Sequence, residues 1–207
     1  MIILGRWGLG LSDTIAFMRE QILSTLVDLS AIDSPSKSEG TISGYVTDRL
    51  KKLGLETTKD QKGNVIGFLP GRGEPILLNA HLDGVLPGKG HTPVIDGDFI
   101  KSDGTTNLRA DDTAGVTIIL EALRKVREEK RTNPPIVTAF TVEEEIGLWG
   151  AKALDLSGYN VQKGIVYDNG HEAGTVISRG AAYIAVDLEL KGKSVHPGKD
   201  LRTGVNT

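Results

Sequence analysis

The sequence predicts an α/β protein with a mixed, mostly parallel β-sheet flanked by helices. Short apolar runs typical of buried strands, at 76–80, 136–140 and 164–167, alternate with longer segments whose apolar residues recur at helical spacing. Each of these runs ends in a polar, acidic segment, as expected where the strands of an open sheet direct their carboxyl ends toward a ligand. The 26 glycines and the low aromatic content, 5%, suit a chain with many tight turns.

The elements follow one another without an internal repeat. We expect helices from Ser12–Asp13 to before Pro35, from 39 to 53, from Asp111–Asp112 to before Pro134, and over 149–154, and strands over 55–59, 64–69, 76–80, 136–140, 164–167 and 182–190. The first helix has a single apolar face, formed by Ile15, Met18, Ile22, Leu26 and Leu29. Residues 84–103 are rich in Gly, Pro and Asp and predict an irregular excursion.

Composition excludes several classes of function. A net charge of −3 without a basic stripe argues against nucleic acid as a partner. There is no cysteine, so a metal would have to be held by His, Asp and Glu. Residues 1–11 are apolar but too short and glycine-rich for a membrane span, which predicts a loose leader, no membrane partner and a cytoplasmic protein.

His81 and Asp83 follow the apolar strand at 76–80. An imidazole at a strand end can bind a metal through one ring nitrogen, while a nearby carboxylate holds the other nitrogen and fixes the tautomer. The alternative is a structural or surface histidine, because a His-x-Asp pair alone is a weak signal. Acidic residues at comparable places along the chain favour the metal ligand.

These acidic residues are Asp111, Glu145 and Asp168, which lie at a helix start or just after a strand. Asp111 and Asp112 have a simpler explanation as helix caps, and the run 143–145 as a solvated surface. Together with His81, however, the three acids form a set of hard ligands suited to Zn²⁺, Co²⁺ or Mn²⁺. A carboxylate can bridge two such ions. Glu144 is adjacent to a ligand and is placed to take a proton from a water molecule.

Three motifs closely resemble the M20 family of co-catalytic metallopeptidases, nearest to its peptidase T-like aminotripeptidase branch. They are the runs Asn79–Asp83, Ala110–Gly115 and Glu143–Gly147. The resemblance implies two divalent ions, zinc or alternatively cobalt or manganese, and a zinc-peptidase-like catalytic domain. By this resemblance, His81 and Asp168 bind the first ion, Asp83 clamps His81, and Asp111 bridges both ions. Glu145 binds the second ion, and Glu144 is the general base. Asp112 is not a ligand and follows a cis peptide bond.

The resemblance also predicts two domains. Residues 12–178 would form the catalytic domain, and 179–207 would begin an α+β lid domain through which full-length family members form homodimers. His196 resembles the lid histidine that helps to hold the substrate carbonyl across such a dimer.

This sequence departs from the family pattern in two ways. Arg109 and Thr113 stand where the motif usually has Gly and Lys, a change that leaves the ligands intact. Family members are also longer, so we expect this chain to end before the lid is complete and before the last histidine ligand of the second ion. We expect His91 and His171 to be solvated loop residues that do not replace that ligand.

The sequence therefore predicts a di-metal aminopeptidase that hydrolyses short peptides from a free amino end, with tripeptides as the expected class. Two alternatives stay open. One is another amidohydrolase of the same family, a deacylase or a carboxypeptidase. The other is a truncated fragment without catalytic activity.

Overall fold

The computed structural model describes residues 2–3, 13–180, 184, 186 and 188–192. The chain divides into two units, Met1–Asn169 and Gly170–Thr207, which are described separately. The first unit contains the helices, the strands and the residues of the candidate site. The domain boundary predicted at 178/179 stays a prediction.

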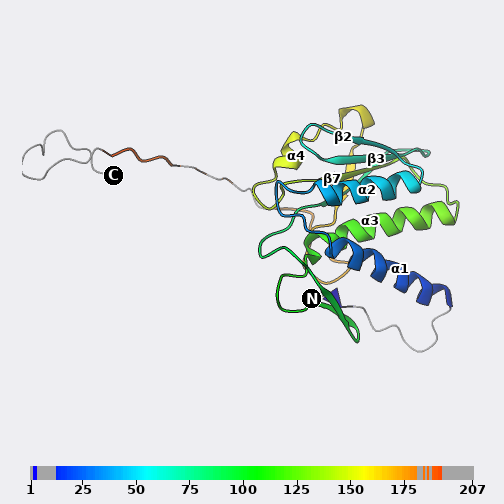
Figure 1. Ribbon diagram of the computed structural model, residues 1–207. Helices are drawn as coiled ribbons and strands as arrows, with labels where there is room; N and C mark the ends of the chain where they lie inside the picture. The colour runs from blue at the N-terminus through cyan, green and yellow to red at the C-terminus, as the bar shows by residue number, and fades with distance from the viewer. Residues whose placement is uncertain (1, 4–12, 181–183, 185, 187, 193–207) are drawn as a thin grey trace, which may run out of the picture. The chain divides into compact units, whose positions relative to one another are not determined.

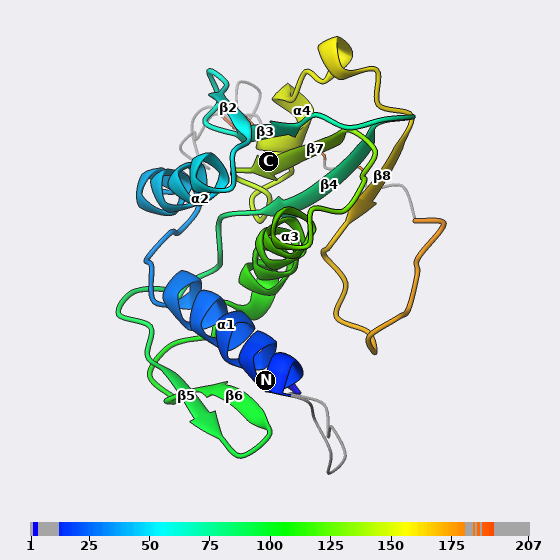
Figure 2. The ribbon, with the colours of Figure 1, turned by 90° about the vertical axis from the view of Figure 1, so that its right-hand side faces the viewer.

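A five-stranded mixed sheet forms the centre of the first unit, in the order β2-β3-β7-β4-β8 (Figure 2). Its strands are β2 (Glu56–Lys59), β3 (Val65–Leu69), β4 (Ile76–His81), β7 (Ile136–Thr141) and β8 (Lys163–Val166). β4 runs parallel to both of its neighbours, β7 and β8, whereas β3 is antiparallel to β2 and to β7. The predicted α/β class with a mixed sheet is confirmed.

The helices complete the layers of this unit. They are α1 (Asp13–Ser30), α2 (Gly40–Lys52), α3 (Ala110–Glu128) and the short α4 (Trp149–Ala153). α2 packs on β2 and β3, α3 packs on β4, and α1 packs on α3 (Figures 1 and 2). On β3, Phe68 contacts Tyr159 of a 3₁₀ turn at Ser157–Tyr159, with ring centroids 5.6 Å apart.

The core explains why the central strand is buried along its whole length and mostly apolar. All six residues of β7 are buried, because the strand lies in the middle of the sheet with both faces covered. Phe140 is fully buried there and belongs to the same apolar cluster as Leu50 of α2 and Leu120 of α3. This packing fixes the position at which β7 ends and the acidic run 143–145 begins.

The prediction of an irregular excursion at 84–103 was wrong in part. Residues Pro93–Asp96 (β5) and Phe99–Ser102 (β6) form an antiparallel hairpin, and Ile2–Ile3 (β1) pairs with β6. Asp96 pairs with Phe99, so Gly97 and Asp98 form a two-residue turn in which Gly97 has φ +59°. A Gly-Asp pair between two runs that contain apolar residues is a hairpin signal that the glycine-rich surroundings obscured.

The strand predicted at 182–190 is not seen in the part of it that the structure describes. Residues 184, 186 and 188–190 have no regular secondary structure, and their apolar side chains are exposed. The other residues of the predicted strand lie outside the described part of the chain. None of the described helices is long and apolar enough to cross a membrane.

Candidate metal centre

The predicted site residues of the first unit gather at one edge of the sheet because β4, β7 and β8 run parallel. His81 is the last residue of β4 and pairs with Thr141 at the end of β7. The amide of Tyr167, just beyond β8, donates to the Asn79 carbonyl at 2.9 Å, which places Asp168 at the same edge. Asp111 arrives from the first turn of α3, which packs on β4.

His81 is held by Asp83 in one orientation. Its side chain is only 2% exposed, and Nδ1 lies 3.0 Å from the Asp83 backbone carbonyl and 3.5 Å from the Asp83 carboxylate. Because a carbonyl only accepts hydrogen bonds, Nδ1 carries the proton. Without a metal, Nε2 is protonated as well and donates to Asp111 Oδ1, 2.9 Å away on the opposite side of the ring; once Nε2 loses that proton, Nδ1 keeps its own and Nε2 offers a lone pair. This is the tautomer that a metal-binding imidazole requires.

The Asp83 carboxylate connects the histidine to the acidic run. It is fully buried and accepts hydrogen bonds from Ser36 Oγ at 2.7 Å, Glu144 N at 2.9 Å and Glu145 N at 3.2 Å. Burial raises the pKa of Asp83, but the hydrogen bonds from His81, Ser36 and the Glu144 amide outweigh burial and lower the pKa to about 2. One ionised carboxylate therefore fixes both the imidazole and the backbone that carries two candidate ligands.

The three glutamates of the run have different surroundings. Glu143 has a left-handed backbone, φ +53°, and its side chain forms an ion pair with Lys62 at 2.7 Å. Its amide donates to Glu39 Oε1 at 3.0 Å, and Glu39 is itself buried. Glu144 and Glu145 instead join the groups around His81.

Two sets of side chains have ligand atoms within 4.8 Å of one another. One is His81, Asp111 and Glu145, and the other is His81, Glu144 and Asp168. Nitrogen and oxygen donors of this kind suit Zn²⁺, which forms bonds of about 2 Å to both. The residues therefore fit divalent metal ions. Glu144, expected as a base, lies in one of these sets, so its geometry also permits ligation.

The negative charge gathered at the site would favour a bound cation. Burial lowers the pKa of His81, but the hydrogen bonds that the imidazole donates to Asp111 and Asp83, with the negative charges of Asp112 and Asp83, outweigh burial and raise the pKa to about 11. Burial and neighbouring carboxylates also raise the pKa values of Glu144 and Glu145. Carboxylates gathered this closely repel one another, and a divalent ion relieves that repulsion.

Asp112 serves the backbone, in agreement with its simpler explanation. Its carboxylate is buried and accepts from the amides of Gly115 at 3.1 Å and His81 at 3.1 Å. The first of these bonds caps α3. Burial raises the pKa of Asp112 to about 8. The peptide bond between Asp111 and Asp112 is cis, as the family resemblance implies.

The other histidines do not join the site in the described part of the chain. The expectation that His91 is solvated was wrong: it is 6% exposed, and its Nδ1 lies 2.9 Å from the Asn107 carbonyl. His171 is exposed, as expected. His196 lies outside the described residues.

Sequence reasoning missed the residues that support the ligands from the loop after α1. Ser36 donates to Asp83, and Pro35 forms a parallel β-bridge with Gly84. The Ser34-Pro35-Ser36 segment was interpreted only as a helix stop. A pattern of small polar residues around a proline does not reveal which distant strand it will contact.

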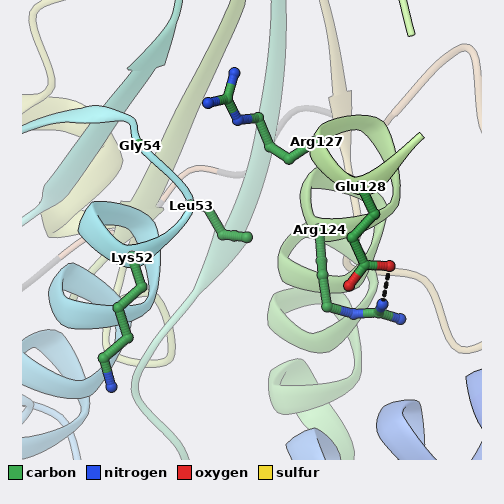
Figure 3. A pocket seen from close by; sticks show the side chains of 6 residues that line it. All are labelled: Lys52, Leu53, Gly54, Arg124, Arg127 and Glu128. Atoms are coloured by element: carbon green, nitrogen blue, oxygen red, sulfur yellow. Dashed lines mark hydrogen bonds and ion pairs between the residues drawn. The ribbon is translucent and has the colours of Figure 1, made fainter. Parts of the chain in front are cut away.

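A separate pocket lies between the C-terminal ends of α2 and α3 (Figure 3). Residues Lys52, Leu53, Gly54, Arg124, Arg127 and Glu128 line it. Arg127 follows Asp111 by 16 positions, which corresponds to about 24 Å along a helix. The pocket is therefore far from His81 and is not the candidate metal centre.

Comparison with known proteins identifies aminopeptidases among the relatives of this chain. Residues 84–187 match the family model of M42 glutamyl aminopeptidases. YqjE of Bacillus subtilis is 32% identical over 197 residues, covering 90% of this chain and 53% of that protein. Peptidase T of Desulfitobacterium hafniense is 26% identical, covering 92% of this chain and 56% of that protein. The crystal structure of aminopeptidase PepT from Bacillus cereus is 35% identical with a TM-score of 0.72, covering 75% of this chain and 44% of that one.

These matches confirm the peptidase T-like resemblance, although the matching family model carries the M42 name instead of M20. The chain spans about half the length of the curated relatives that it matches.

Proposed function

The chain belongs to the M42 glutamyl aminopeptidase family, and on that premise we propose that it is a metal-dependent aminopeptidase acting on short peptides, of the tripeptidase type. The observation that carries the proposal is the arrangement around Asp83, whose carboxylate holds the His81 ring on one side and the Glu144 and Glu145 amides on the other. Such an arrangement places an imidazole and two carboxylates at one point, and this suits metal-assisted hydrolysis once a metal replaces the proton on Nε2.

The proposed ligands are His81, Asp111, Glu145 and Asp168. Divalent ions bound there would polarise the scissile carbonyl and acidify water. The proposal assigns the bridging position to Asp111, the first ion to His81 and Asp168, and the second ion to Glu145. Both ligand sets contain His81, and this supports a centre built around that residue.

Glu144 is the proposed general base. Its carboxylate takes one proton from the attacking water, whose oxygen forms the new bond to the carbonyl carbon. As the C–N bond breaks, Glu144 delivers that proton to the leaving amine nitrogen. Burial and neighbouring carboxylates raise the pKa of Glu144, which makes it a stronger base than an exposed glutamate. The products are a free carboxylate and a new amino terminus.

The proposal extends to the partners and location of the protein. It includes a cytoplasmic location and a homodimer formed through 179–207, with His196 contacting the substrate carbonyl. One of the sequence relatives is the cytosol non-specific dipeptidase of Escherichia coli, which is 30% identical over 142 residues. Sedimentation analysis of the purified protein tests the dimer.

The Glu144→Gln variant tests the base directly. Glutamine has the same size but cannot take a proton, so tripeptide hydrolysis should fall by roughly 100-fold or more. Bound metal per chain, measured by plasma emission spectrometry, should stay near that of the parent. Glu145→Gln is the matched variant, and it should lose the second metal equivalent. A Glu144→Gln protein that keeps most of its activity would show that the base is another group.

The substrate class is tested with three related compounds, two of which are peptides of the same sequence. A free tripeptide, its N-acetylated form and the corresponding N-acetylated amino acid are compared at equal concentration. An aminopeptidase should cleave only the free tripeptide. Preference for the acetylated amino acid would instead indicate a deacylase.

A further inference from the structure

Arg109 occupies an unusual position for an arginine. Only 4% of it is exposed, and its backbone is left-handed, with φ +57° and ψ +30°. Both features disfavour this residue, because a buried guanidinium loses hydration and a side chain strains the left-handed conformation that glycine adopts freely. The family motif usually has glycine here, so the arginine is not needed to form the turn.

The guanidinium binds two backbone carbonyls from different segments. Nη2 donates to the Leu82 carbonyl at 3.0 Å, and Nη1 donates to the Ile32 carbonyl. No carboxylate of the described residues lies within 4.0 Å of the group, although Asp33 and Asp83 contribute favourable charge at longer range. Arg109 thus acts as a fork between β4 and the loop after α1, while its backbone begins α3.

The two segments are fitted closely around this side chain. A Cβ atom on Gly84 would lie 2.9 Å from Arg109 Nε, so a side chain there would displace the guanidinium or the backbone of residue 84. The Leu82 carbonyl also accepts from Ser34 Oγ at 2.6 Å, and the Gly84 amide donates to the Ser34 carbonyl at 3.1 Å. The peptide between Leu82 and Asp83 is therefore held by two donors from other segments, Ser34 and Arg109.

We propose that Arg109 is a positioning residue that sets the direction of the His81 imidazole; this rests on the proposed function, in which His81 is a metal ligand. The Leu82 carbonyl belongs to the peptide between Leu82 and Asp83, so the hydrogen bonds to it fix the orientation of that peptide and of Asp83. The Asp83 backbone carbonyl and carboxylate in turn hold His81 Nδ1. Without the hydrogen bonds from Arg109, the peptide between Leu82 and Asp83 could change its orientation. The Asp83 groups that hold Nδ1 would then move, and the imidazole would turn so that Nε2 no longer faces Asp111.

The test uses Co²⁺, because its visible absorption spectrum reports the geometry of its ligands. Arg109→Gly removes the fork; glycine suits the left-handed backbone, and this offsets part of the thermal stability lost when the Ile32 carbonyl is left without its donor. Co²⁺ affinity, measured by competition with a chelator, should fall by roughly 10- to 100-fold with an altered spectrum. Millimolar guanidinium should restore both, whereas sodium at the same ionic strength should not. If the glycine variant does not fold, Arg109→Lys takes its place, because lysine keeps the charge but cannot reach both carbonyls.

Arg127→Ala is the control, because Arg127 lies in the pocket at the other end of α3 (Figure 3). It should keep the affinity and spectrum of the parent. An Arg109→Gly protein with the parent spectrum, or a loss of affinity that follows thermal stability and resists guanidinium, would overturn the proposal. A parent that binds Co²⁺ without cleaving tripeptides would count against the proposed function alone.

Discussion

Asp83 shows how one buried carboxylate can organise a site. One of its oxygens accepts from the Glu144 amide, and the other accepts from the Glu145 amide and the Ser36 hydroxyl. The backbone carbonyl of the same residue fixes the proton on His81 Nδ1. Hydrogen bonds to a charged group contribute about 1.5–3 kcal/mol each, so the ionised form of Asp83 is strongly favoured. The imidazole and the acidic run are thereby placed by a single residue.

Asp83→Asn should weaken both the site and the fold. An asparagine directs an NH₂ group at a position where a backbone amide needs an acceptor, which leaves a buried donor unpaired at a cost of about 1–3 kcal/mol. Metal affinity should fall roughly 10- to 100-fold, because the imidazole keeps the backbone carbonyl of residue 83 but loses the negative charge of the carboxylate 3.5 Å from Nδ1. Isothermal titration with Zn²⁺ and urea unfolding measure the two effects. The control is Asp98→Asn, which removes only an exposed pair with Arg19; equal effects from both variants would contradict this role of Asp83.

At the scale of elements, α3 and the segment after β8 meet at a glycine. A Cβ atom on Gly115 would lie 2.3 Å from Asp112 Oδ1 and 2.4 Å from the Tyr167 carbonyl. Tyr167 immediately precedes Asp168, so the close approach of helix and strand determines where this candidate ligand lies. The small residue is therefore part of the site, although it has no chemistry of its own.

Gly115→Ala should destabilise the protein by about 1–3 kcal/mol, the usual cost of overpacking a core. It should also reduce Zn²⁺ affinity, because Tyr167 and Asp168 must move away from α3. Gly44→Ala is a matched change in α2, where a Cβ atom would meet nothing within 4 Å. That variant should gain about 0.5–1 kcal/mol from helix propensity and bind Zn²⁺ normally. Chemical denaturation distinguishes the two, and a Gly115→Ala protein as stable as Gly44→Ala would contradict the packing argument.

The sequence predicted the elements whose signals are local. The apolar run of β7 and the periodic face of α3 indicated their type and their approximate bounds, and the polar residues after β4 and β7 indicated an edge with ligands. The contacts of Arg109 with Leu82 and Ile32 could not be predicted, because they join segments 27 and 77 positions away. Burial of His91 was missed for the same reason, since a glycine-rich loop does not reveal what covers it.

At the scale of the molecule, the candidate centre joins the first turn of α3 to the ends of three strands. The ligands come together only in the folded state, so a metal that binds this centre stabilises that state. At a metal concentration 100 times the dissociation constant, the free energy of unfolding should rise by about 2.7 kcal/mol. For a unit of this size that corresponds to a rise in melting temperature of roughly 5–10 °C. Differential scanning calorimetry with Zn²⁺ and with a chelator measures the difference. His81→Ala should abolish the shift, and an equal shift in that variant would place the stabilising metal elsewhere.

If His81, Asp111, Glu145 and Asp168 hold the divalent ions of a peptidase, zinc must bind among these four residues. Diffraction from crystals soaked in Zn²⁺, recorded on both sides of the zinc absorption edge, locates bound zinc without assumptions about its ligands. Anomalous peaks should appear about 2 Å from His81 Nε2 and from the carboxylate of Asp111. Peaks only at other residues, with water in place of metal beside His81, would contradict it.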